Sequence, residues 1–83
     1  MEITKEASSA TGNRKFIELQ SRAGTASLET NAYTKQWGVK FKLASGFTVE
    51  NIEWAEALIN EAKTILQDPD NAWQKIINER SAK

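Results

Sequence analysis

The sequence predicts an α+β fold: a three-stranded antiparallel sheet packed on one amphipathic helix, with a short C-terminal helix after it. Three observations lead to this prediction. Polar and apolar residues alternate in the first half of the chain, an apolar stripe with helical spacing follows, and Pro69 separates that stripe from a shorter one. A sheet with one apolar side and one polar side is typical of a sheet that packs on helices through one face only.

Alternation with a period of two predicts three strands, at Lys15–Arg22, Thr25–Asn31 and Trp37–Leu43. Ala23-Gly24 provides a short hairpin connection between the first two. The third strand has the clearest pattern, because its four large apolar residues share one side and its two lysines share the other. The outward side of the sheet is therefore expected to be polar.

The helix is predicted over Thr48–Gln67, with Thr48 as its N-cap. Its apolar face is expected to contain Ile52, Ala55, Ile59, Ala62 and Leu66, widened by Leu58 and Ile65. On this basis we expect Ile59→Asp to unfold the protein. Asp68 as an N-cap and Pro69 as the first helical residue predict a second helix that contains Trp73, Ile76 and Ile77.

Residues 1–13 are weakly patterned and predict either a flexible terminus or a fourth, edge strand near Glu2–Lys5, with a loop over Ser8–Asn13. Residues 14–83 are expected to form a single β-β-β-α-α domain, since 83 residues provide for one modest core.

The composition argues against catalysis and points to a binding protein. The chain has no histidine and no cysteine, so the commonest general base, thiol nucleophile and zinc ligands are missing. We therefore expect no enzyme, no metal and no cofactor. No stretch is apolar enough to cross a membrane, and we expect a cytoplasmic protein.

Charge is divided unevenly, although the net charge is zero. Through residue 47 there are seven basic residues against four acidic ones, and from residue 48 four against seven, so the two parts carry +3 and −3. Basic residues with interleaved aromatics on an open sheet suit single-stranded nucleic acid, whose phosphates bind cations and whose bases stack on rings. The candidate binding residues, with Phe16 beside them, are Arg14, Lys15, Arg22, Tyr33, Lys40 and Lys42.

Two alternatives remain open. Lys40 and Lys42 could simply keep an exposed face soluble, paired across strands with Glu29 or Glu18. The chain could instead be a protein-interaction module, for example a phage-type regulatory adaptor or a homodimer, that uses its acidic helical side. Its interface residues would then be Trp54, Trp73 and Ile77.

Two known families share parts of this layout. Three strands followed by a helix resemble double-stranded-RNA-binding domains, but those have a basic helix start where this chain has the acidic Thr48–Glu53. The stretch Gly38–Leu43, a turn and Val49–Trp54 is similar in layout to the positive-cofactor-four coactivators and their phage and bacterial relatives. That resemblance implies a dimer with a curved sheet that binds single-stranded DNA. The helix after Pro69 departs from it.

Overall fold

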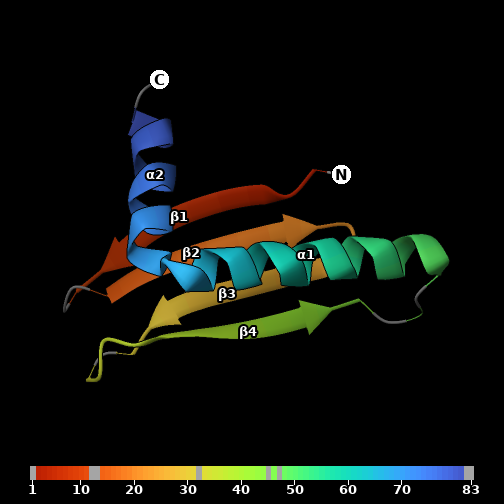
Figure 1. Cartoon of the computed structure of the whole chain (residues 1–83), viewed down its shortest axis with the longest axis horizontal. Helices are drawn as coiled ribbons and strands as arrows, with labels where there is room; N and C mark the ends of the chain where they lie inside the picture. The colour runs from red at the N-terminus through yellow and green to blue at the C-terminus, as the bar shows by residue number, and fades with distance from the viewer. Residues whose placement is uncertain (1, 12–13, 32, 45, 47, 82–83) are drawn as a thin grey trace.

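The chain folds as four strands followed by two helices (Figure 1). The strands are β1 (Thr4–Ala10), β2 (Arg14–Ser21), β3 (Gly24–Thr30) and β4 (Trp37–Leu43), and the helices are α1 (Val49–Gln67) and α2 (Pro69–Ser81). The computed structural model describes residues 2–11, 14–31, 33–44, 46 and 48–81, with the side chains of all of these except 80 and 81. The predicted α+β class, an antiparallel sheet with one long and one short helix, is confirmed.

The sheet is an antiparallel meander in the order β1-β2-β3-β4, and both helices cover the same face (Figure 1). α1 packs along β2 and β3, and α2 turns away across β1. Ile17, Leu19, Leu28 and Leu58 are the largest fully buried side chains between these layers. Each stabilises the fold by about 1.5–3 kcal/mol through removal of apolar surface from water.

The edge strand β1 is longer than the sequence suggested and lies further along the chain. It extends to Ala10 and pairs with β2 from Arg14 to Gln20, with Ala7 opposite Ile17. Ser8 to Ala10 are therefore strand residues rather than the start of a loop. The alternation of polarity is weak here because Ala7 is the only buried residue of β1. Residues 1, 12 and 13 of the predicted N-terminal segment lie outside the described residues.

The buried face of α1 is rotated from the predicted one. Its buried residues are Ala55, Leu58, Ala62 and Ile65, whereas Ile52 and Ile59 remain 46% and 43% exposed. The expectation that Ile59→Asp unfolds the protein is therefore withdrawn, because Ile59 lies at the flank of the helix.

The start of α1, its end and the start of α2 agree with the signals predicted from Thr48 and Pro69. The Thr48 side chain accepts a hydrogen bond from the Asn51 N–H at 3.3 Å, as expected of an N-cap. α1 ends at Gln67, two residues before the proline, and α2 begins at Pro69 itself.

Candidate nucleic-acid interface

The face of the sheet away from the helices is defined by the strand register. Residues paired across strands share a face, so each row on this open face has one side chain from each strand. The three complete rows, in strand order, are Thr4-Gln20-Thr25-Lys42, Glu6-Glu18-Ser27-Lys40 and Ser8-Phe16-Glu29-Gly38. Arg14, opposite Ala10, begins the face at its other end.

Charge on the open face is separated across the strands. Three acidic residues, Glu6, Glu18 and Glu29, balance three basic ones, Arg14, Lys40 and Lys42. Glu6 lies directly opposite Glu18, which makes the β1–β2 half acidic. The positive charge is concentrated along β4, and this half of the face is the one that suits a polyanion.

Neither Lys40 nor Lys42 has an ion-pair partner within the described part of the chain. Glu29, one of the two acidic partners considered for them, binds Arg14 instead, with its Oε2 accepting from Nη2 at 3.2 Å. The cross-strand pairing that would have explained these lysines is therefore not formed.

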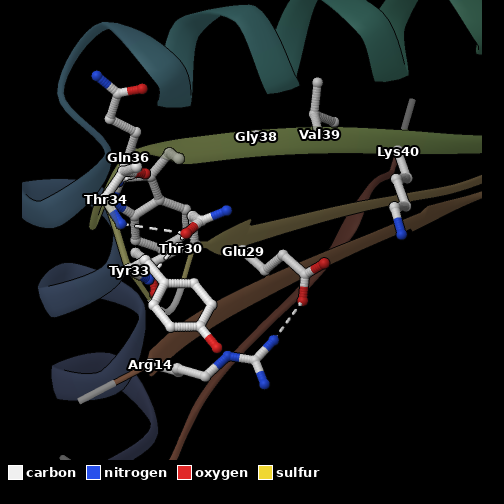
Figure 2. Close-up of a pocket in the computed structure, with 11 residues that line it drawn as sticks. Arg14, Glu29, Thr30, Tyr33, Thr34, Gln36, Gly38, Val39 and Lys40 are labelled. Atoms are coloured by element: carbon white, nitrogen blue, oxygen red, sulfur yellow. Dashed lines mark hydrogen bonds and ion pairs between the residues drawn. The ribbon is translucent and has the colours of Figure 1, made fainter. Parts of the chain in front are cut away.

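A hollow of about 530 Å³ lies where the open face meets the connection from β3 to β4 (Figure 2). Arg14 and Glu29 line one part of it, Tyr33 rises from the connection, and Gly38 and Lys40 belong to β4. A Cβ atom added at Gly38 would meet nothing within 4 Å, so the absence of a side chain there keeps the hollow open. The volume falls within the range of small-ligand sites, about 300–1,000 Å³.

Tyr33 is held away from the protein by the turn that precedes it. The Asn31 side chain accepts hydrogen bonds from the backbone N–H groups of Tyr33 at 2.8 Å and Thr34 at 3.1 Å. This arrangement is an Asx-turn, in which the side chain takes the place of a backbone carbonyl. The Tyr33 side chain is 93% exposed as a result, so packing within the fold does not account for it.

Arg14 is positioned by an aromatic ring and a carboxylate. Its guanidinium lies 5.1 Å from the centroid of the Phe16 ring, within the range of a cation–π interaction. Its buried Nε atom has no hydrogen-bond partner among the described residues. The ring of Phe16 and the carboxylate of Glu29 therefore hold the Arg14 guanidinium beside the hollow.

Lys15 and Arg22 lie on the helix side of the sheet rather than beside the other four candidates. Lys15 follows Arg14 directly, so its side chain has the opposite parity, and its Nζ lies 3.2 Å from the Asp70 carboxylate of α2. Arg22 lies in the two-residue turn after Ser21, where strand alternation has ended. Its guanidinium pairs with Glu50 of α1 at 2.8 Å and lies 5.9 Å from the centroid of the Trp54 ring.

The candidate protein-interface residues do not form one patch. The Trp73 indole N–H donates to the Ser8 carbonyl at 2.9 Å, and Lys15 lies over its ring. Trp54 lies near Arg22 at the opposite end of β2. Ile77 is partly buried against the core. Trp73 and Ile77 therefore dock α2 within the chain.

Asp70 is an important residue that the sequence did not single out. Its Oδ1 accepts hydrogen bonds from Lys15 Nζ at 3.2 Å and from the Trp37 indole at 3.3 Å. These two bonds, the Lys15 bond foremost, lower the pKa of Asp70 below its ordinary value of 3.8. Only the folded chain brings the three residues together, since they come from β2, β4 and α2.

The chain matches no protein family model, and it has no match among the curated proteins or the solved structures. Among the described residues no helix has the length and apolarity to cross a bilayer. In the same part of the chain, no group of three or more acidic side chains is placed to hold a metal ion.

Proposed function

We propose that this protein is a non-catalytic binding protein for single-stranded nucleic acid, which it takes on the β3–β4 half of the open face. The observation that carries the proposal is the convergence of Arg14, Tyr33 and Lys40 on one hollow. These residues come from β2, from the connection after β3 and from β4, so only the fold brings them together. They supply the two things that such a ligand needs, fixed cations and an exposed ring.

The hollow and β4 would have different roles in binding. A base stacks on the Tyr33 ring, which is exposed and held by the Asn31 turn. The backbone then follows β4, where Lys40 and Lys42 project from the same face, about 7 Å apart. Glu6 and Glu18 repel the polyanion from the β1–β2 half and so determine the path of the nucleic-acid strand.

The arrangement predicts moderate and salt-sensitive binding without strong sequence preference. Three cations face the ligand, and each neutralised phosphate of a single strand contributes about −0.7 to the slope of log K against log salt. The expected slope is therefore no steeper than about −2. A much steeper slope would require cations from outside the open face, such as Lys15 or Arg22.

Gly38→Val tests the hollow directly. A Cβ atom at this position meets nothing within 4 Å, and valine favours strands, so the fold should be retained while the hollow is filled. We expect affinity for a fluorescently labelled mixed-sequence oligonucleotide to fall at least tenfold. Ser8→Val is the matched control, because Ser8 lies in the same row at the opposite edge of the sheet.

The lysines are tested by the double substitution Lys40→Glu with Lys42→Glu. We expect it to abolish oligonucleotide binding at low salt, because it makes the whole open face acidic. Unchanged affinity in this variant, or equal affinity in Gly38→Val and wild type, would refute nucleic-acid binding at this site.

A further inference from the structure

A strip of exposed apolar side chains lies on the other side of β4, between that strand and α1. It consists of Phe41 and Leu43 of β4 with Ile52 and Ile59 of α1, and we call it the β4–α1 strip. These side chains are 41%, 40%, 46% and 43% exposed, in that order. They are four of the six large hydrophobic residues that remain exposed in the described part of the chain. Such clustering marks an interaction surface more often than scattered exposure does.

The position of the strip follows from the orientation of α1. Ile52 and Ile59 are seven residues apart and so share one flank of the helix. Glu61 lies on the opposite flank, where it pairs with Lys5 of β1. The isoleucine flank therefore faces β4, which α1 also contacts.

β4 is also an edge strand with unused backbone groups. It pairs with β3 on one side, and no other described strand pairs with its outer side (Figure 1). Alternate residues of Trp37–Leu43 therefore direct their N–H and C=O groups away from the sheet, which is a template for one more strand.

A strand added at this edge would meet two different surfaces. Its side chains on the helix face would contact the β4–α1 strip, and those on the open face would lie beside Lys40 and Lys42. Because side chains alternate along a strand, the complement is an extended segment in which apolar and acidic residues alternate.

A second copy of this chain fits the edge poorly. If β4 paired with itself, lysines of one copy would lie against the same lysines of the other on the open face. Like charges directly across a strand pair are destabilising. The charge of the edge selects an acidic partner instead.

We propose that the outer edge of β4 docks an extended segment of another protein that alternates apolar and acidic residues, by addition of a fifth strand. This interaction is separate from nucleic-acid binding, although both ligands use Lys40 and Lys42 and would therefore compete. It gives the protein-interaction alternative a surface distinct from Trp54, Trp73 and Ile77.

The probe is a labelled nine-residue peptide that alternates valine and glutamate, with valine at both ends, titrated at pH 7. We expect saturable binding that is at least tenfold tighter than that of the same peptide with lysine in place of glutamate. Ile59→Glu should weaken binding of the glutamate peptide at least tenfold. Val49→Glu is the matched control, since Val49 is a 77% exposed apolar residue of the same helix outside the strip.

If circular dichroism shows that Ile59→Glu does not fold, the charges of β4 provide a second test. The Lys40→Glu and Lys42→Glu pair should reverse the preference between the two peptides. The proposal is overturned if wild type binds neither peptide, if it binds both equally, or if folded Ile59→Glu binds as wild type does. It is also overturned if sedimentation shows a dimer that Ile59→Glu dissociates, because a second copy would then cover the strip.

The two proposed ligands can be separated by variants on opposite sides of β4. Tyr33→Ala should weaken oligonucleotide binding and leave peptide binding unchanged, because Tyr33 lies in the connection and not in the strip. Ile59→Glu should do the reverse. If wild type binds only one of the two ligands, the proposal for the other ligand has failed, and a variant that weakens neither activity or both refutes the surface assigned to its residue.

Discussion

The two edges of the sheet have different surroundings. Along β1, the helix layer supplies polar and apolar partners to the strand. Lys5 pairs with Glu61 of α1, the Ser8 carbonyl accepts from the Trp73 indole, and α2 packs over the strand. Ala7, in the middle of β1, is 4% exposed as a result.

Along the C-terminal half of β4, by contrast, Phe41 and Leu43 on the helix face remain about two-fifths exposed, whereas Trp37 and Val39 earlier in the strand pack against the core. In the part of the chain that the structure describes, α2 turns toward β1 (Figure 1), and Phe41 and Leu43 belong to the C-terminal half of β4. The comparison shows that α2 packs over the β1 edge of the sheet, whereas apolar side chains at the C-terminal end of the β4 edge remain partly exposed. Apolar groups at the β1 edge are explained by folding, whereas Phe41 and Leu43 at the β4 edge are the groups that the proposed fifth strand would cover.

The largest expected effect comes from detaching β4 at its C-terminal end. Gly24 lies opposite Leu43 with a φ of +147°, and a Cβ there would lie 2.2 Å from the Lys42 carbonyl oxygen. Gly24→Ala should lower the free energy of unfolding by about 3–4 kcal/mol, through backbone strain and separation of the two strands. Chemical denaturation measures the loss, and hydrogen exchange should show it concentrated in β4.

Gly38→Ala is the control for this substitution, because the new methyl group meets no atom within 4 Å. It should leave stability unchanged or raise it by up to about 1 kcal/mol, as loss of a strand glycine does. Equal destabilisation by the two substitutions would show that the close approach at Gly24 does not hold β4 in place.

A pair of truncations compares the two edges directly. Trp73→Ala removes a partly buried ring and its hydrogen bond to Ser8, and should cost about 2–3 kcal/mol. Ile59→Ala removes a side chain that is 43% exposed, and should cost less than about 1 kcal/mol. Urea denaturation of both variants measures the difference. Similar losses would mean that the β4–α1 strip is as important to the fold as α2 docking is.

The strands and helix ends were predictable because local signals determine them. Trp37–Leu43 was predicted with its observed bounds, and Pro69 marks the start of α2. For β1 the sequence permits two alternatives, a flexible terminus or an edge strand, because neither face of the strand is rich in large apolar residues. Its stability comes from pairing with β2 and from α2, and no local pattern shows either.

The parts of the interface that needed tertiary information were less predictable. Parity along β4 correctly placed Lys40 and Lys42 together on the open face. Arg22 was misplaced because the strand ends one residue earlier, at Ser21. The buried face of α1 was ambiguous because Ile52 and Ile59 are as apolar as Leu58 and Ile65. Only the position of the helix over β2 and β3 decides between them.

The smallest expected effect concerns Asp70, which connects α2 to both the β1–β2 half and the β3–β4 half of the sheet. It accepts hydrogen bonds from Lys15 of β2 and from Trp37 of β4, and these lower its pKa in the folded state. A lowered pKa means that the charged carboxylate stabilises the fold above the unfolded value of about 3.8. This contribution is lost as the pH falls through the lower, folded value.

Asp70→Asn should therefore reduce stability by less than about 1 kcal/mol at pH 7, since the carboxylate is largely exposed and screened by solvent. The difference from wild type should shrink toward zero below pH 3.8. Urea denaturation of both proteins between pH 7 and pH 2.5 measures it. A difference that grew on acidification would mean that Asp70 is stabilised in its protonated form, so that its bonds to Lys15 and Trp37 do not tie α2 to β2 and β4.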